Sequence, residues 1–184
     1  MELTGETISE IGQRIVAKEP RAAFSHSTLM AKVVPNGSRG TLCRRQFWTK
    51  NIGTGVSVQI GTRRQIIVAP HHVSRDWCLT HADLESGKLH YHDPLYHGPN
   101  QTRALGALGA YIDQVHCEQG RVKPQEQPPS GAFPAELHIY PRQRGCSSCG
   151  VCVLIETQRI VDGGVDAPRE EMFAEAELLR FRAK

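Results

Sequence analysis

The sequence predicts an α+β fold in which helices pack around a central, mostly antiparallel sheet. Amphipathic helical patterns stand near the start, in the middle and at the end of the chain, and two β-type segments are joined by a very short turn. The expected order is helix, strands, helix, strand, helix, helix. The chain has 184 residues and shows no convincing internal boundary, so residues 1–184 are expected to form one domain.

The first helix is expected within ETISEIGQRIVAK, because Ile8, Ile11 and Ile15 recur on one helical face. Thr7 and Glu10 have the spacing of a capping box, which would start this helix.

Strands are expected where short β-type runs stand between turn-forming residues. RQIIVA (64–69) predicts a buried strand, and DWCLTHADL (76–84) with KLHYHD (88–93) predicts an antiparallel hairpin around ESG. ELHIY (136–140) predicts a further strand. NGSRG (36–40) and a later proline-rich stretch are expected to be loops.

Three further helices follow from periodicity and from end signals. Residues 102–117 carry apolar residues at helical spacing, namely Leu105, Leu108, Ile112 and Val115. The apolar VCVLI segment fits either a strand or a helix, and is interpreted as a helix that begins near Ser148. PREEMFAEAELLRFRAK predicts a terminal helix, because Pro168 suits a first turn.

Composition excludes several classes of protein. The formal net charge of +3 gives no basic stripe of the kind that nucleic-acid or membrane-surface binding needs. Apolar runs stay well below the length of a membrane span, and the first residues are acidic and polar, unlike a secretory signal. Six cysteines without an export signal indicate a reducing compartment and free thiols.

Half of these cysteines stand in RQRGCSSCGVCVLI, at positions 146, 149 and 152. A structural zinc site would need a second ligand pair elsewhere, which the spacing does not provide. A redox C-x-x-C site would follow a thioredoxin-like run, which is not present. The metal and redox hypotheses are therefore ranked below a single reactive thiolate.

The residues that flank the cluster favour that thiolate. Cys149 stands at a predicted helix start, where the positive end of the helix dipole would lower the pKa of the thiol. Gly150 would leave room for a substrate backbone, and Gln143 could donate a hydrogen bond to an oxyanion. A base and an orienting carboxylate would have to come from elsewhere in the chain.

Several motifs, in order, resemble those of the ubiquitin-like-protein proteases, the SUMO-deconjugating cysteine peptidases. PRQRGCSSCGVCV resembles their nucleophile motif, Q-x-N-G-x-D-C-G. Other matching segments are LTGETI, AAFSHSTLMAKV, FWTK, IIVAPHHVSRDWCLTHADLESGKLHYHDPL and MFAEAELLRFRAK. The resemblance covers nearly the whole chain. It implies a papain-like cysteine protease fold of the ubiquitin-like protease type.

The resemblance also implies roles for particular residues. Cys149 matches the nucleophile, Gln143 the oxyanion-hole glutamine, and Asp93 the carboxylate that orients the catalytic histidine. Trp77 matches the tryptophan that helps to form the tunnel for the diglycine tail of the substrate. The position of the catalytic histidine itself is occupied by Asp76.

This departure removes the expected base. In the family the histidine deprotonates the thiol and later protonates the leaving amine. An aspartate is ordinarily ionised at neutral pH and is therefore a poor general acid. A carboxylate at position 76 would also repel Asp93 and raise the pKa of the Cys149 thiol.

The chain has nine histidines, any of which could in principle replace the base that is missing at position 76. His72 shares strand parity with Asp76, but four extended residues would separate them by about 13 Å unless the strand begins later. His81 and His92 are expected to point to the other side of the sheet from Asp76 and Asp93. All are expected to be exposed or half-buried residues of the sheet.

Two smaller departures concern the substrate tunnel and the nucleophile motif. Ser148 stands where the family usually has aspartate, and the second tunnel tryptophan would fall at Glu2. Because the chain begins so close to this segment, a truncated or fragmentary chain is one expectation.

The leading hypothesis is a cysteine peptidase or isopeptidase that cleaves a SUMO-type modifier at its C-terminal glycine. The alternative is a catalytically impaired pseudoprotease that binds such a modifier. The resemblance implies a monomer without cofactor or metal, in the nucleus or cytoplasm, whose partner is the modifier or its conjugates rather than nucleic acid or membrane.

Overall fold

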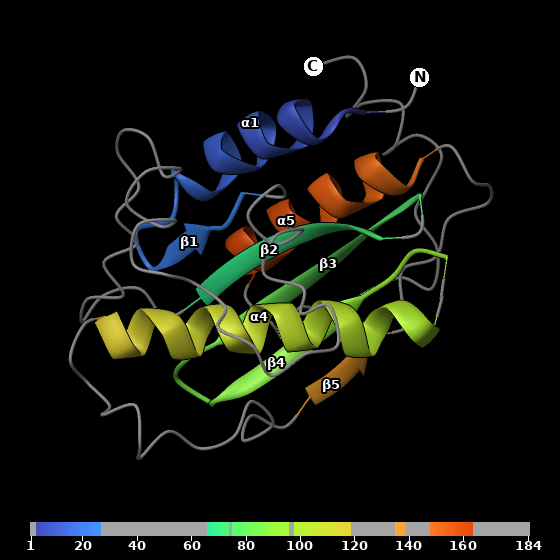
Figure 1. Ribbon diagram of the computed structural model, residues 1–184. Coiled ribbons are helices and arrows are strands. Elements are labelled where there is room, and N and C mark those ends of the chain that lie inside the picture. The colour runs from blue at the N-terminus through green and yellow to red at the C-terminus, as the bar shows by residue number, and fades with distance from the viewer. Residues whose placement is uncertain are drawn as a thin grey trace.

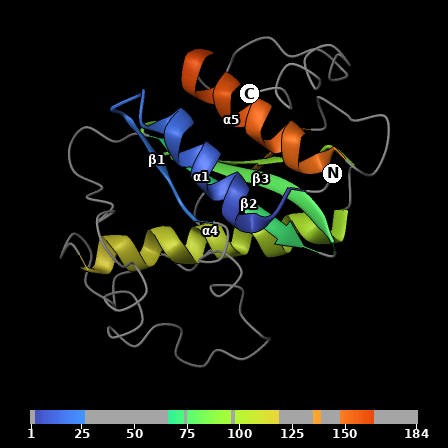
Figure 2. The same cartoon turned by 90° about the horizontal axis from the view of Figure 1, so that it is seen from above.

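A computed structural model describes residues 3–26, 66–73, 75–95, 98–118, 135–138 and 148–163. The elements are α1 (Gly5–Val16), β1 (Ala22–Phe24), β2 (Ile66–Val73), β3 (Asp76–Asp83), β4 (Lys88–His92), α4 (Gly98–Glu118), β5 (Ala135–His138) and α5 (Cys149–Gly163). The sheet lies between α4 on one side and α1 with α5 on the other (Figures 1 and 2).

The five strands are ordered β1-β2-β3-β4-β5. The three central strands pair antiparallel, whereas β1 is parallel to β2 and β5 is parallel to β4. The sheet is therefore mixed, with an antiparallel centre, and the predicted α+β class is confirmed. The predicted β3–β4 hairpin is also confirmed, with Asp83 opposite Lys88.

The strand predicted over 64–69 continues further than expected. β2 runs through Pro70 to Val73 and turns directly into β3, so that Val73 faces Asp76 and His72 faces Trp77. Arg75, in the turn, has a left-handed φ of 71°. His72 and Asp76 thus lie on opposite arms of a tight hairpin, and the expectation that one extended strand separates them is wrong.

Both faces of the sheet are buried. The face toward α4 includes Ile67, Ala69, Val73, Cys78, Ala82, Leu89 and Tyr91, which pack on Ala104, Leu105, Ala107, Leu108, Tyr111 and Ile112. The opposite face places Val68, Trp77 and Leu79 against Ile8 and Ile15 of α1 and against Cys149, Val153 and Leu154 of α5. Burial of apolar surface on two sides of one sheet supplies the main stabilisation of this fold.

The start of α1 differs from the prediction. Thr4 is the N-cap, and its Oγ1 accepts a hydrogen bond from the backbone N–H of Thr7 at 3.3 Å. Thr7 lies inside the helix, and the Glu10 side chain instead pairs with Arg14, at 2.6 Å. The capping box predicted from Thr7 and Glu10 is therefore wrong, because the helix begins one turn earlier.

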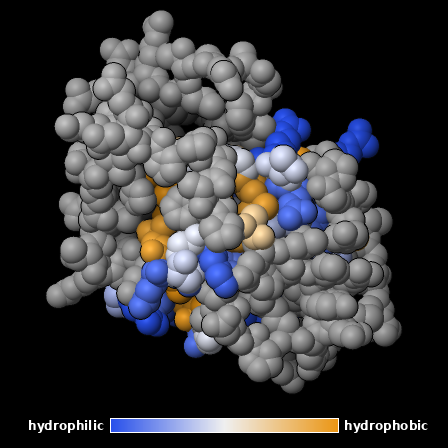
Figure 3. Space-filling view, turned by 90° about the horizontal axis from the view of Figure 1, so that it is seen from below, coloured by the Kyte–Doolittle hydropathy of each residue, from blue (hydrophilic) through white to orange (hydrophobic). Residues whose placement is uncertain are grey.

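Several predictions fall outside the described residues: the loop 36–40, the proline-rich loop, the terminal helix, Glu2 and Gln143. Among the helices that the structure describes, none combines the length and the apolar character required to traverse a bilayer. Figure 3 shows one face of the molecule, on which apolar side chains appear between hydrophilic ones.

Candidate active site

Cys149 is the first residue of α5, as the sequence predicts. The backbone carbonyl of Ser148 accepts a hydrogen bond from Cys152 N at 2.9 Å and so closes the first turn. The Cys149 side chain is only 4% exposed and belongs to the apolar cluster that contains Trp77. The start of the helix thus holds the thiol against β3.

The electrostatic surroundings of this thiol differ from the expectation. Burial raises the pKa of the Cys149 thiol, hydrogen bonds with the backbone of Trp77 and Gly150 lower it, and the Asp76 carboxylate raises it. The net direction is upward, so the expected lowering by the helix dipole is wrong. Desolvation of a nearly buried sulfur outweighs the favourable dipole, and deprotonation needs a proton acceptor.

Side chains of α1 and β3 approach α5 closely at Gly150. A Cβ atom at this position would lie 2.9 Å from Ile8 Cδ1, and 3.4 Å from both Leu3 Cβ and Trp77 Cδ1. The space that was expected to admit a substrate backbone is therefore occupied by the protein's own side chains. The missing side chain permits the docking of α1 against α5 beside Cys149.

Asp93 follows β4 and is held at both carboxylate oxygens. Oδ2 accepts a hydrogen bond from the Tyr91 hydroxyl at 2.8 Å, and Oδ1 accepts one from Leu95 N at 2.9 Å. The side chain is 3% exposed. These bonds fix the carboxylate, which suits it to orient another group.

Cys78 lies close enough to Asp76, Asp93 and Cys149 for the charges of all three to act on its thiol. Burial raises the pKa of its thiol, and the charges of Asp93, Asp76 and Cys149 raise it as well, whereas a hydrogen bond with Tyr91 lowers it. Cys78 faces α4 and is a free, fully buried thiol. Asp76, Asp93 and Cys149 are thus all near one point of β3.

Comparisons with known proteins concern the fold that holds this arrangement. No model of a known protein family matches the sequence. A Sentrin-specific protease of Caenorhabditis elegans is 29% identical over 112 residues, which cover 57% of this chain and 15% of that protein. Among solved structures, the SUMO protease Ulp1 with an oxidised catalytic cysteine aligns over 98% of this chain and 74% of its own, with a TM-score of 0.70 and 21% identity.

Two further structures extend the likeness. The Ulp1 protease domain in complex with Smt3, the yeast ortholog of SUMO, covers 98% of this chain and 73% of its own, with a TM-score of 0.67 and 22% identity. A Ulp1-like SUMO protease catalytic domain of Chaetomium thermophilum covers 97% and 67%, with a TM-score of 0.60 and 19% identity. This chain folds as a Ulp1-type ubiquitin-like-protease domain. It spans about 15% of the length of the curated relative.

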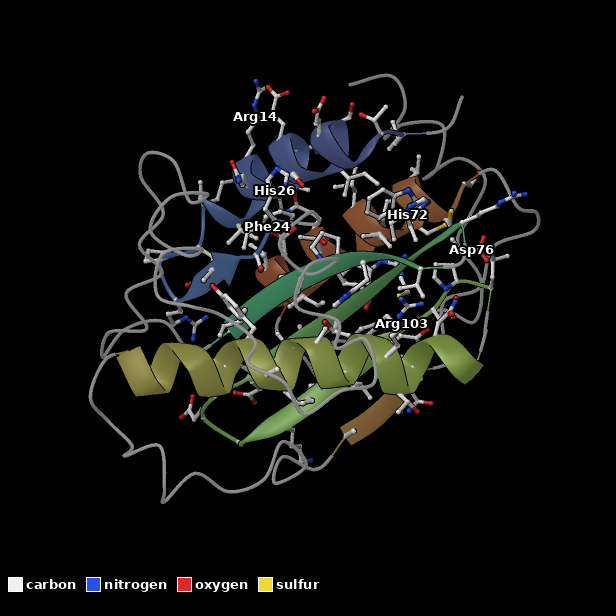
Figure 4. The ribbon with its side chains drawn as sticks, in the orientation of Figure 1. Arg14, Phe24, His26, His72, Asp76 and Arg103 are labelled. Atoms are coloured by element: carbon white, nitrogen blue, oxygen red, sulfur yellow. The ribbon has the colours of Figure 1, made fainter. Side chains whose placement is uncertain are left out.

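Within this Ulp1-type fold, Asp76 is the first residue of β3 and is half-buried. It precedes Trp77, whose backbone bonds to Cys149. His72 lies across the hairpin from Trp77, and the two rings are in contact with their centroids 4.8 Å apart and their planes tilted by 35°. Figure 4 shows His72 and Asp76 at the same end of the sheet, where the β2–β3 turn lies.

His71 and three histidines of β3 and β4 are buried, and the expectation of exposed or half-buried residues is wrong for these four. His71 faces α4, where its Nε2 shares a hydrogen bond with Thr80 Oγ1 at 2.7 Å, and burial lowers the pKa of His71 to about 3. His81, His90 and His92 are also buried. The reason is that helices cover both faces of the sheet.

His81, His90, His92 and Glu156 form a buried polar cluster on the opposite side of the sheet from Asp93. The His81 and His90 rings stack at 4.2 Å, and His92 Nε2 and His81 Nδ1 share a hydrogen bond at 2.9 Å. His92 Nδ1 lies 3.3 Å from Glu156 Oε1. Sequence reasoning missed this cluster, although a glutamate inside the apolar run of α5 is a signal that it needs a partner there.

Within the described part of the chain, no three histidine, cysteine or acidic side chains are arranged to hold a metal ion. Among the described cysteines, Cys78, Cys149 and Cys152 take part in no disulfide bond. Cys146 lies outside the described residues, so the ranking of the metal and redox hypotheses stays a prediction.

Proposed function

We propose that this domain is a cysteine peptidase or isopeptidase that cleaves a ubiquitin-like modifier of the SUMO type after its C-terminal glycine. The observation that carries the proposal is Cys149 at the first position of α5, where its thiol bonds to the backbone of Trp77 at the start of β3. Its setting within a Ulp1-type fold supports the same chemistry.

The reaction assigns a role to each candidate residue. The Cys149 thiolate attacks the carbonyl carbon of the terminal glycine, and Gln143 donates a hydrogen bond to the oxyanion that forms. The C–N bond then breaks, the amine leaves with a proton, and a thioester remains on Cys149 until water hydrolyses it. Trp77 lines the path of the diglycine tail, and Asp93 orients a basic side chain.

A second candidate is a pseudoprotease that binds the modifier without cleaving it. A specific observation favours it: the Asp76 carboxylate raises the pKa of Cys149. The sequence resemblance assigns the family histidine to this same position. Both candidates predict binding of a SUMO-type modifier, and they differ in whether a thiolate forms.

The test is incubation of the protein with SUMO that carries a C-terminal vinyl sulfone, followed by mapping of the adduct by mass spectrometry. We expect one adduct on Cys149, no adduct on Cys149→Ser, and an unchanged adduct on Cys152→Ser. Cys152 is the matched control, because it is another buried cysteine of α5.

Saturable binding of SUMO without an adduct would support the pseudoprotease. Absence of both binding and adduct would contradict both candidates. A parallel reaction with ubiquitin vinyl sulfone tests the assignment to a SUMO-type modifier.

A further inference from the structure

The geometry points to His72 as the general base and acid that replaces the missing histidine of the active site. This inference rests on the proposed peptidase function and names a further catalytic residue for it. The observation behind it is the β2–β3 register, which places His72 directly opposite Trp77 rather than four residues along one strand from Asp76.

The register also decides which face of the sheet His72 occupies. Directly paired residues of an antiparallel sheet project to the same face. His72 therefore lies on the face of Trp77, which is the face that packs against Cys149 and α5. His72 and Cys149 both contact Trp77, one through its ring and the other through its backbone.

The other described histidines do not offer this combination. His71 faces α4 and is bonded to Thr80. His81, His90 and His92 are buried in the polar cluster with Glu156. His26 follows β1 and lies away from the end of the sheet that carries His72 and Asp76 (Figure 4). Among the histidine side chains that the structure describes, His72 alone is exposed next to Trp77.

The surroundings of His72 suit proton transfer. An exposed imidazole can accept a proton near neutral pH and return it. The tilted contact with the Trp77 indole restricts the His72 ring, which is the orienting function that a carboxylate serves in the usual triad. The charged residues at this end of the hairpin are Asp76 and Arg75. The titratable group that α5 contributes here is the Cys149 thiol. The Asp76 carboxylate raises the pKa of the Cys149 thiol, so the thiol needs a proton acceptor.

His72 carries the proton in both half-reactions. The His72 imidazole takes the proton of Cys149 Sγ, and the thiolate forms a C–S bond with the glycine carbonyl carbon. When the C–N bond breaks, the imidazolium gives its proton to the leaving amine. In the second half-reaction the imidazole takes a proton from water, the hydroxide attacks the thioester, and the Cys149 thiolate leaves and is protonated.

The test compares His72→Phe, which keeps a ring against Trp77 but removes the ring nitrogens, with His26→Ala as a matched histidine removal elsewhere. Cleavage of SUMO that carries a C-terminal aminocoumarin amide should fall about a hundredfold or more in His72→Phe, and should stay unchanged in His26→Ala. Asp76→His in the His72→Phe background should restore cleavage by at least tenfold, because position 76 is close enough to Cys149 for its charge to act on the thiol.

A second measurement needs no substrate and tests the pairing of His72 with Cys149 separately from the peptidase function. The rate of Cys149 alkylation by iodoacetamide, followed against pH by mass spectrometry, should show an inflection that is absent in His72→Phe. If the wild type leaves the SUMO amide intact but keeps this inflection, the peptidase function fails and the His72–Cys149 pairing stands. If His72→Phe retains cleavage within threefold, or leaves the alkylation profile unchanged, the assignment of His72 is overturned.

Discussion

A methyl group at position 150 would enter the tightest packing of the candidate active site. Its carbon would lie 2.9 Å from Ile8 Cδ1, and Ile8 is 0% exposed, so this methyl cannot swing into solvent. Overpacking of a core costs about 1–3 kcal/mol. Alanine gains up to about 1 kcal/mol over glycine from helix propensity. We expect Gly150→Ala to lower the free energy of unfolding by about 1 kcal/mol.

The matched control is Gly106→Ala in α4, where a Cβ atom would meet nothing within 4 Å. This change should raise the free energy of unfolding by up to about 1 kcal/mol, because only the propensity gain remains. Urea denaturation of both variants at one pH measures the difference, which should be about 2 kcal/mol. Equal stabilisation by both substitutions would refute the packing argument.

Ile8→Val removes the Cδ1 atom that a methyl at position 150 would meet. Gly150→Ala combined with Ile8→Val should therefore be more stable than the sum of the two single changes predicts, by roughly 1 kcal/mol. Cleavage of the SUMO amide by this double variant should match that of Ile8→Val alone. Restored stability with lost cleavage would instead assign Gly150 to substrate approach, as the sequence suggested.

Three further changes test other contacts. Gly12→Ala should lower the free energy of unfolding by about 2 kcal/mol or more, which is a larger loss than for Gly150→Ala, because the Phe24 ring packs against the Gly12 α-carbon. Phe24→Leu in the Gly12→Ala background should recover part of this loss in thermal melts. Tyr91→Phe removes the hydroxyl that donates to buried Asp93, and should lower the free energy of unfolding by roughly 1–3 kcal/mol in urea titrations. His71 has a folded pKa of about 3, below the ordinary value of about 6.5 for an unfolded chain, so unfolding takes up a proton between these values. The contribution of His71 to stability is fully present above about pH 6.5 and is lost as pH falls toward 3, by up to about 5 kcal/mol. His71→Gln should reduce the slope of the free energy of unfolding against pH in this range by one proton. An NMR titration of folded His71 near pH 6.5 would contradict this prediction.

Local patterns were sufficient to predict the β3–β4 hairpin and the start of α5. The ESG turn stands between two β-type runs, and the apolar segment after Gly150 has no turn residue to interrupt it. Strand parity also correctly placed His81 and His92 on the face opposite Asp93.

The register of β2 could not be predicted in the same way. Pro70 and the two histidines after it resemble the end of a strand, because proline cannot donate a ladder hydrogen bond. Only the pairing with β3 shows that the strand continues to Val73. The burial of His90 and Glu156 was missed for a related reason. It depends on α5 covering the second face of the sheet, which is a long-range contact.

The β2–β3 hairpin brings His72, Asp76 and Trp77 together within a few residues of chain, whereas Cys149 reaches them only when α5 packs on the sheet. Hairpins close within microseconds, and contacts between distant segments form later in folding because they require a larger loss of chain entropy. The thiol would therefore meet its partners late in folding. A newly made or partly unfolded chain carries Cys149 apart from the hairpin, so its reactivity toward a modifier tail reports completed folding, and hydrogen exchange of the first turn of α5 should track the loss of that reactivity.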